Sequence, residues 1–184
     1  MNTFSSASKL KLGENVVDLK QSLLKKTQKK LSDGEATNPI YVVIESENQG
    51  GFQTKISIRD HEIISDQPFG FNGQNRGPKP SELVLAALAA CQETTYRIFA
   101  EEMNIQIGKI SVTLRGTQDL RGFMALDDEI PAGFANIEGK IFIQSDATDE
   151  ELQLLQQRVD RHCPVLDDLK RPLDVHLSVE KCSA

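Results

Sequence analysis

Apolar residues recur at intervals of three and four positions in several parts of the chain, a spacing typical of helices that bury one face. The first such segment covers residues 14–31, and Asp33-Gly34 follows it as a stop signal. The second begins at Pro80 and runs to about Met103, because proline is tolerated at a first helical position, where its missing N–H is not needed. These patterns predict an amphipathic helix near the start of the chain and a long one in its middle.

A third helix is indicated by its capping residues. Thr148 is followed three positions later by Glu151, the spacing of a capping box, in which each side chain binds the backbone N–H of the other residue. Apolar residues at helical spacing come next, and Cys163-Pro164 ends the pattern because a residue before proline is pushed out of the helical conformation. We therefore expect a helix from Asp149 to about His162.

Segments with alternating or continuous apolar residues and β-branched side chains predict strands. They cover residues 41–44, 54–59, 63–64, 105–115, 134–144 and 173–179. The first three are joined by short turns and predict an antiparallel meander, whereas the glycines and prolines of 69–80 predict a loop. The chain is therefore expected to have the α+β class, with a flexible tail at 1–13, an amphipathic helix and linker at 14–38, and one domain at 39–184.

Composition limits the classes of partner. The net charge is −6 and no Lys/Arg run has aromatic residues interleaved with it, so nucleic acid is not expected as a partner. The longest apolar stretch, Leu83 to Ala90, has eight residues, whereas a membrane-spanning helix needs about 20. We expect a soluble cytoplasmic protein without a membrane partner, whose three cysteines are kept as thiols.

Metal and cofactor sites are not expected. The three histidines, His61, His162 and His176, are scattered, and the chain contains no Cys-x-x-Cys pair. The glycine-rich segments lack the pattern of a phosphate-binding loop.

Two motifs carry a family resemblance. The segment Gly77-Pro78-Lys79-Pro80-Ser81-Glu82-Leu83-Val84-Leu85-Ala86-Ala87-Leu88-Ala89-Ala90-Cys91, followed later by His162-Cys163-Pro164-Val165, resembles the OsmC and organic-hydroperoxide-resistance superfamily. Residues 121–126 and 130–134 are similar to a subgroup of that superfamily. The likeness covers roughly residues 40–180.

The resemblance implies a fold and an activity. It implies antiparallel sheets wrapped around long central helices in an intertwined homodimer. It also implies that Cys91 attacks an organic hydroperoxide as a thiolate, that Cys163 resolves the oxidised sulfur as a disulfide, and that an external dithiol reduces this disulfide.

The residues around Cys91 do not by themselves indicate a reactive thiol. On a helix its face is shared mainly with apolar side chains such as Val84 and Leu88, which is equally typical of a buried, unreactive cysteine. An apolar environment raises the pKa of a thiol, so a working thiolate needs a nearby cation. The N-terminus of the helix is too far away to supply that charge, because its field fades within the first turn.

The source of the cation is left open. By resemblance, organic-hydroperoxide-resistance proteins place an arginine in the first hairpin and an acidic residue ten positions before the cysteine, where this chain has Asn48-Gln49-Gly50-Gly51-Phe52 and Ser81. Glu82 fits the Pro-x-Glu-Leu form of the broader superfamily. The candidate cations are Arg76 and Arg121, which lie in irregular segments where functional residues concentrate, and also Arg59 and Arg97.

Two alternatives follow from these departures. The protein either reduces hydroperoxides, or keeps the fold as a non-catalytic protein that binds an apolar ligand or acts as a redox sensor. Cys163 at a helix C-terminus is expected to be protonated at rest. Cys182, near the end of the chain, is expected to be incidental.

Overall fold

The computed structural model describes residues 25–34 and 39–182, and the chain divides into two compact units, Met1–Val42 and Val43–Ala184. In the first unit, residues 25–32 are helical, which confirms the later part of the helix predicted over 14–31. The tail predicted at 1–13 and the first half of that helix lie outside the described residues.

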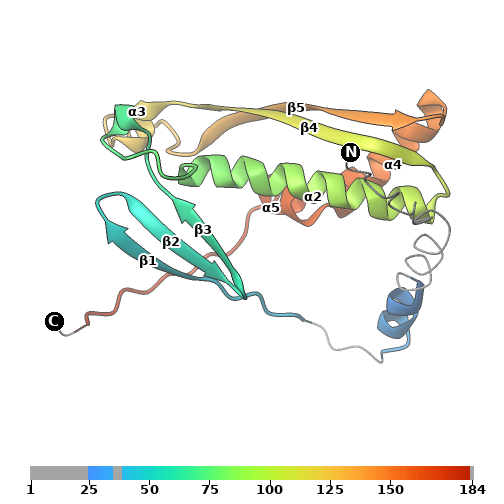
Figure 1. The fold of residues 1–184 in the computed structure, drawn as a ribbon, viewed down its shortest axis with the longest axis horizontal. Helices are drawn as coiled ribbons and strands as arrows, with labels where there is room; N and C mark the ends of the chain where they lie inside the picture. Colours follow the sequence, from blue (N-terminus) through green and yellow to red (C-terminus); the bar gives the residue numbers. More distant parts are fainter. Residues whose placement is uncertain (1–24, 35–38, 183–184) are drawn as a thin grey trace, which may run out of the picture. The chain divides into compact units, whose positions relative to one another are not determined.

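The second unit combines helices with two antiparallel sheets, which confirms the α+β class (Figure 1). One sheet is the meander β1-β2-β3 and the other is the long hairpin β4-β5. The elements are β1 (Glu45–Gly50), β2 (Gln53–Ile58), β3 (His61–Ser65), η1 (Phe69–Phe71), α2 (Pro80–Glu102), β4 (Ile107–Gln118), α3 (Leu120–Phe123), β5 (Phe134–Ser145), α4 (Asp149–His162) and α5 (Pro164–Lys170).

The meander follows from its turn residues. β1 pairs with β2 in a register that places Glu45 opposite Ser57, and the turn between them has positive φ angles at Gly50 and Gly51, a conformation that glycine adopts without steric cost. β2 pairs with β3, with Ile56 opposite Ile63. The predicted meander is thus confirmed for its second and third strands, whereas its first strand lies at Glu45–Gly50 and not at residues 41–44.

Two predicted strands are wrong. Residues 41–44 and 173–179 belong to no strand. The apolar side chains of both segments are exposed, from 46% at Leu173 to 99% at Val179. Alternating apolar residues favour a strand only where a neighbouring strand supplies hydrogen bonds, and in the described part of this chain none lies beside these segments.

Helix α2 begins where the sequence predicts. The backbone N–H of Lys79 donates to Glu82 Oε2 at 3.0 Å, and Pro80 occupies the first helical position. At the other end, Asn104 has a positive φ of 56° and terminates the helix. The long central helix is thereby confirmed within one residue at its C-terminus.

The core of the second unit lies where α2 packs against β4 and α4 (Figure 1). Tyr96 and Ala100 of α2 are buried there with Ile110 of β4 and with Leu155 and Val159 of α4. Full burial of an aliphatic side chain such as Leu155 contributes about 1.5–3 kcal/mol. This packing fixes α4 against the half of α2 that follows Cys91.

The end of α4 differs in part from expectation. The predicted capping box is confirmed, because Glu151 N donates to Thr148 Oγ1 at 3.2 Å and Thr148 N donates to Glu151 Oε2 at 2.8 Å. Cys163 then leaves the helix with an extended backbone (ψ 111°), and Pro164 starts a further helix, α5, that the sequence pattern did not predict. Cys163 therefore lies at a corner between two helices.

The connection between β4 and β5 is also more ordered than predicted. The strand predicted over 105–115 continues to Gln118 in β4, and the short helix α3 follows at Leu120–Phe123. Asp119 caps α3 by accepting a hydrogen bond from Arg121 N at 3.0 Å.

Candidate active site

Two cysteines that are 72 positions apart meet in the second unit. Cys163 Sγ donates a hydrogen bond to Cys91 Sγ at 3.3 Å. Cys163 is fully buried, whereas Cys91 is half-buried and therefore partly open to a reactant. Both are free thiols, and a disulfide bond of about 2.05 Å requires the two sulfur atoms to approach by only about 1.2 Å.

The environment keeps Cys163 protonated. Burial raises the pKa of the Cys163 thiol, and both the hydrogen bond to Cys91 and the charge on Cys91 raise this pKa further, while the Leu166 backbone and the Thr95 hydroxyl act in the opposite direction. Because this pKa is raised, the proton is retained on the buried sulfur. Cys163 is the donor of the pair and Cys91 is the acceptor.

The local structure explains how these sulfurs meet. Cys91 lies near the middle of α2, and Thr95 one turn later donates its hydroxyl to the Cys91 carbonyl at 2.7 Å. Cys163 N donates to Val159 O at 2.8 Å, which ties the corner after α4 to its last turn. Because α2 contacts both α4 and α5, this corner is held against the helix that carries Cys91.

Glu82 does not reach the sulfur atoms. Its carboxylate binds the Lys79 N–H at the start of α2, and nine residues separate it from Cys91, which corresponds to about 13.5 Å of helix rise. Glu82 therefore stabilises the first turn of α2.

Arg76 is associated with a buried carboxylate instead. Asp66 accepts hydrogen bonds from the backbone N–H groups of Gln67 (2.8 Å), Gln74 (3.1 Å) and Arg76 (3.1 Å). Burial raises the pKa of Asp66, but these three N–H groups and the Arg76 charge outweigh it and hold that pKa below its usual range. Asp66 thus organises the loop that leads into α2, and the Arg76 charge acts on Asp66.

Close packing supports the same loop. A Cβ at Gly73 would overlap the Gln67 carbonyl, so a larger residue cannot be placed there without moving the backbone. The backbone N–H of Asp66 donates to Pro78 O at 3.2 Å and closes the loop at its base.

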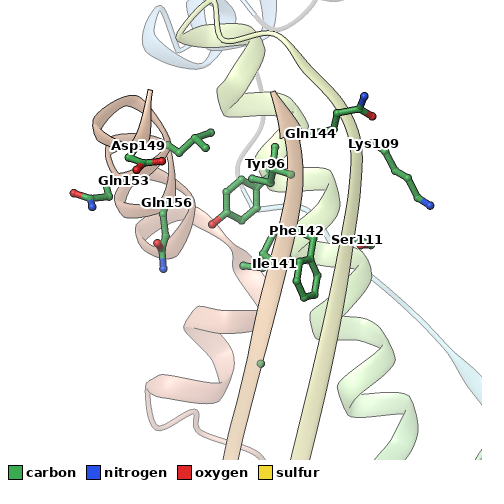
Figure 2. Close-up of a pocket in the computed structure, with 12 residues that line it drawn as sticks. Tyr96, Lys109, Ser111, Ile141, Phe142, Gln144, Asp149, Gln153 and Gln156 are labelled. Carbon is green, nitrogen blue, oxygen red and sulfur yellow. The ribbon is translucent and has the colours of Figure 1, made fainter. Parts of the chain in front are cut away.

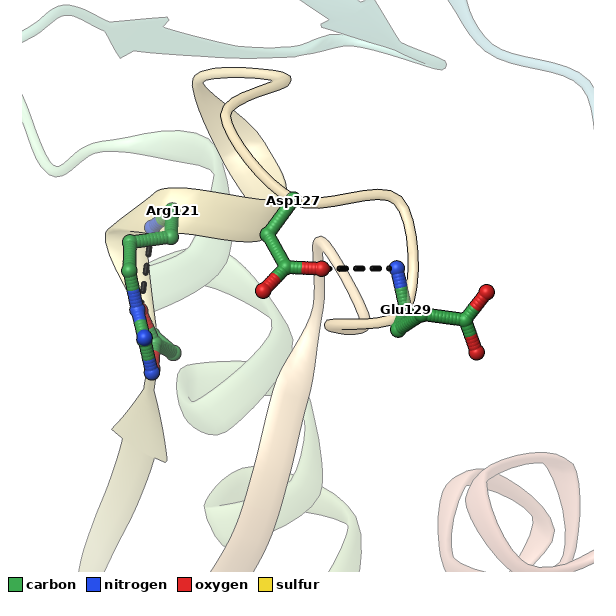
Figure 3. A network of polar contacts seen from close by, with 4 residues as sticks. Arg121, Asp127 and Glu129 are labelled. Carbon is green, nitrogen blue, oxygen red and sulfur yellow. Dashed lines mark hydrogen bonds and ion pairs between the residues drawn. The ribbon is translucent and has the colours of Figure 1, made fainter.

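Arg121 is engaged by its neighbour. Its guanidinium forms an ion pair with Asp119 at 2.7 Å, and this contact lowers the pKa of Asp119 to about 2. Figure 3 shows Arg121 beside a second local contact, in which Glu129 N donates to Asp127 Oδ1 at 3.1 Å. The Arg121 side chain is 62% exposed, and its ion pair is a surface contact of the β4–β5 connection.

The other two candidate cations have different positions. Arg97 Nη2 donates to the Gly108 carbonyl at 3.1 Å, across the connection from α2 to β4. Arg59 lies in the turn between β2 and β3 with a positive φ of 55°. The groups that act on the pKa of Cys163 are the Leu166 backbone and the side chains of Cys91 and Thr95; in the described part of the chain they include none of the four candidate arginines.

A large cavity lies away from the cysteines, between the β4–β5 sheet and α4. Its volume is about 770 Å³, and Figure 2 shows the Tyr96 ring between β5 and α4 within it. Burial, followed by the charge of Asp160, raises the pKa of Tyr96 to about 12, so this phenol is neutral at physiological pH. The walls include Lys109 and Ser111 of β4 and Gln153 of α4, and neither sulfur lines them.

A second cavity flanks α2, the helix that carries Cys91. It has a volume of about 560 Å³ and lies between α2, the β4–β5 sheet, α4 and α5. Gln92, next to Cys91 in sequence, lines this space, which we call the Gln92 cavity. Its walls are formed by Leu88, Gln92, Val112, Leu114, Phe134, Ala135, Asn136, Ile137, Glu138, Gly139, Ile141, Asp160, Leu166, Leu169 and Lys170.

Within residues 25–34 and 39–182, no three His, Cys, Asp or Glu side chains are grouped so that they could hold a metal ion. No helix in that part of the chain is both long and apolar enough to cross a bilayer.

Of the predicted site residues, the structure brings together Cys91 and Cys163. Sequence reasoning missed the roles of Asp66, Thr95 and Gln92. Asp66 binds three N–H groups of the loop that follows it, Thr95 binds the Cys91 carbonyl one turn earlier, and Gln92 has an unpaired Oε1. One signal for Asp66 was present, since an acidic residue directly before a loop rich in glycine and proline is well placed to accept the N–H groups of that loop.

Comparison with known proteins agrees with this architecture. A family model described as OsmC-like protein matches residues 73–178, which is more than half of the chain. A comparison with curated protein sequences gives no significant match.

Several solved structures share the fold. An OsmC-like protein from Mycoplasma pneumoniae is 20% identical, with a TM-score of 0.63 over 71% of this chain and 88% of its own. An organic hydroperoxide resistance protein OsmC from Legionella pneumophila is 18% identical, with a TM-score of 0.57 over 73% and 92% of the two chains. An organic hydroperoxide resistance protein from Elizabethkingia anophelis is 21% identical, with a TM-score of 0.54 over 71% and 89%. At these identities the likeness establishes the fold.

Proposed function

The chain belongs to the family of OsmC-like proteins, and on this premise we propose that it is a thiol-dependent peroxidase that reduces organic hydroperoxides. The observation that carries the proposal is the 3.3 Å separation of Cys163 Sγ and Cys91 Sγ. Structural neighbours named organic hydroperoxide resistance proteins support the choice of substrate class.

The first step oxidises Cys91. Its thiolate attacks the outer oxygen of ROOH, so that an S–O bond forms, the O–O bond breaks, and the departing alkoxide takes a proton to give ROH. Cys91 is the reacting sulfur because it is the more accessible one and accepts the Cys163 hydrogen bond, whereas Cys163 is buried with a raised pKa.

The second and third steps regenerate the thiols. Cys163 attacks the Cys91 sulfenic acid, the S–S bond forms, and the oxygen of the sulfenic acid leaves as water with the Cys163 proton. An external dithiol then reduces the disulfide by exchange through a mixed disulfide. Resolution needs little motion, because the two sulfur atoms already lie within about 1.2 Å of bonding distance.

Turnover under excess dithiol tests this activity. A catalytic amount of protein is mixed with cumene hydroperoxide and dithiothreitol, and the peroxide is measured over time. The proposal predicts many equivalents consumed per protein, loss of turnover in Cys91→Ser, and unchanged turnover in Cys182→Ser, since Cys182 is exposed near the chain end. Consumption that survives Cys91→Ser would rule the mechanism out.

A second candidate is a non-catalytic member that senses oxidants or binds an apolar ligand. It is favoured by the contacts of three candidate cations, because the Arg76 charge acts on Asp66, Arg121 pairs with Asp119, and Arg97 binds the Gly108 carbonyl. This candidate predicts slow alkylation of Cys91 by iodoacetamide at neutral pH, or disulfide formation without turnover. The peroxidase predicts fast alkylation of Cys91.

We further propose that the protein is a homodimer formed through α2. Small and apolar residues of this helix are exposed in the single chain, among them Val84, Ala86, Ala87, Ala90 and Ile98. The exposed apolar segment 173–179 offers unpaired backbone for the same contact. Light scattering should give twice the chain mass of 20.4 kDa, and Ala87→Glu should shift it to one chain mass. A wild-type monomer would refute this arrangement.

A further inference from the structure

The Thr95 hydroxyl is a hydrogen-bond donor that the backbone of its helix does not require. It donates to the Cys91 carbonyl at 2.7 Å, and this carbonyl lies inside α2, where the backbone N–H four residues later already serves it. A threonine hydroxyl that binds the carbonyl of the preceding turn does not strengthen a helix, so helix stability does not explain the bond. Thr95 is only 5% exposed, and bulk water therefore competes little for its hydroxyl.

The position of Thr95 brings this hydroxyl to the two thiols. Thr95 follows Cys91 by four residues, which puts both side chains on one face of α2. Cys163 Sγ lies 3.3 Å from Cys91 Sγ, and the Thr95 hydroxyl is within reach of a hydrogen bond to the Cys163 side chain. A hydroxyl has one proton and turns about its C–O bond, so it can serve either the Cys91 carbonyl or the Cys163 sulfur.

Cys163 needs such a donor when it reacts. To attack the Cys91 sulfenic acid, the Cys163 sulfur must give up its proton and carry negative charge. Burial works against this charge and raises the pKa of Cys163, whereas the Leu166 backbone and the Thr95 hydroxyl act to lower it. A hydrogen bond to a charged sulfur in a site closed to water is stronger than one between neutral groups.

We propose that Thr95 assists the resolution step: as Cys163 gives up its proton, the Thr95 hydroxyl turns from the Cys91 carbonyl to the Cys163 sulfur and stabilises the negative charge there. The Cys163 proton passes to the oxygen of the Cys91 sulfenic acid, the S–O bond breaks, the S–S bond forms, and water leaves. Thr95 keeps its own proton throughout. This inference rests on the proposed peroxidase chemistry and assigns one of its steps to a third residue.

Other titratable groups near Cys163 are engaged elsewhere. On α2, Cys91 is the titratable group that acts on the pKa of Cys163. His162 of α4 is exposed and packs on an aromatic ring of α2, with 5.2 Å between the ring centroids. Asp167 of α5 is held in an ion pair at 2.9 Å on the surface. A change in the pH dependence of resolution after substitution of Thr95 therefore reports on Cys163.

The test is a single-turnover experiment on the reduced full-length protein, mixed with cumene hydroperoxide without dithiol and quenched in acid at successive times. Intact mass spectrometry distinguishes the sulfenic acid, which has gained an oxygen, from the disulfide, which has lost two hydrogens. As the hydroperoxide concentration is raised, the initial slope of the rate measures oxidation of Cys91, and the plateau rate of disulfide formation measures resolution.

Thr95→Val keeps the branched shape of the side chain and removes the hydroxyl. We expect it to leave the initial slope unchanged and to lower the plateau rate by about 10-fold or more, the effect of one hydrogen bond to a charged group. Its plateau rate should also rise only at a higher pH than in the wild type, because loss of the donor raises the pKa of Cys163.

Two variants serve as controls. Thr95→Ser retains a hydroxyl at this position and should restore both the plateau rate and its pH dependence, whereas Thr94→Val makes the same change at the exposed neighbouring position and should resolve like the wild type. Equal plateau rates in the wild type and Thr95→Val, or a slowing that Thr95→Ser does not reverse, would overturn the role of Thr95 and leave the peroxidase intact. A wild type that forms neither a Cys91 sulfenic acid nor the disulfide would overturn the peroxidase and this inference with it.

Discussion

Because the Gln92 acceptor is unpaired, we predict that replacing Gln92 raises the stability of the protein, whereas most core substitutions lower it. Gln92→Leu replaces a buried amide by an apolar side chain of similar length, next to a cavity that can accommodate the new branch. An unsatisfied buried acceptor costs about 1–3 kcal/mol. We therefore expect the variant to unfold with a free energy about 1–3 kcal/mol higher than the wild type, or a Tm raised by roughly 2–4 °C per kcal/mol.

The measurement is urea unfolding of the reduced protein, followed by circular dichroism, without added ligand. Gln156→Leu on the exposed surface of α4 is the matched control and should stay within about 0.5 kcal/mol of the wild type. A loss of 1 kcal/mol or more in Gln92→Leu would contradict the reasoning, because it would show that the Gln92 amide is already paired in solution. A higher free energy of unfolding in Gln92→Leu would show that the wild-type protein keeps the Gln92 amide although it lowers stability.

Other predictions concern the loop, the thiols and the phenol. Asp66→Asn replaces an acceptor of three backbone N–H groups by a side chain that must turn its NH₂ toward at least one of them. The pKa of Asp66 in the folded protein lies below the unfolded value of about 3.9, so the stability that the carboxylate contributes is present near pH 7 and is lost in acid. The urea midpoints of wild type and variant should therefore differ fully near pH 7 and converge as the pH falls below about 4. In Cys163→Ser, one equivalent of hydroperoxide should leave a persistent Cys91 sulfenic acid that dimedone traps, whereas Cys182→Ser should show no trapping. The pKa of Tyr96 is raised to about 12, so the unfolded chain ionises first and stability should decline from about pH 10 to 12; Tyr96→Phe should remove that part of the alkaline decline in chemical unfolding.

Local signals in the sequence were sufficient to predict where α2 and α4 begin. Pro80 with Glu82, and Thr148 with Glu151, mark helix starts because the hydrogen bonds that form there join residues only three positions apart. Helix α5 escaped prediction because its seven residues are too few for a hydrophobic period to be visible after Pro164.

Strands and site residues depend on distant partners. The alternation over 173–179 is typical of a strand, yet within residues 25–34 and 39–182 no strand lies beside it, and sequence alone does not reveal that. The meeting of Cys91 and Cys163 was implied by family resemblance, since the helix face of Cys91 is equally typical of an unreactive buried cysteine. The lack of a partner for Gln92 Oε1 depends on all the segments packed around it, so no local pattern could have shown it.

The identity of the disulfide formed by oxidation tests the central claim most directly. Reduced protein is treated with one equivalent of cumene hydroperoxide, the remaining thiols are alkylated, and the peptides are mapped by mass spectrometry without reduction. The 3.3 Å separation predicts a bond between Cys91 and Cys163 in nearly every chain, with Cys182 alkylated. Oxidation confined to Cys182, with Cys91 and Cys163 both recovered as alkylated thiols, would contradict the account.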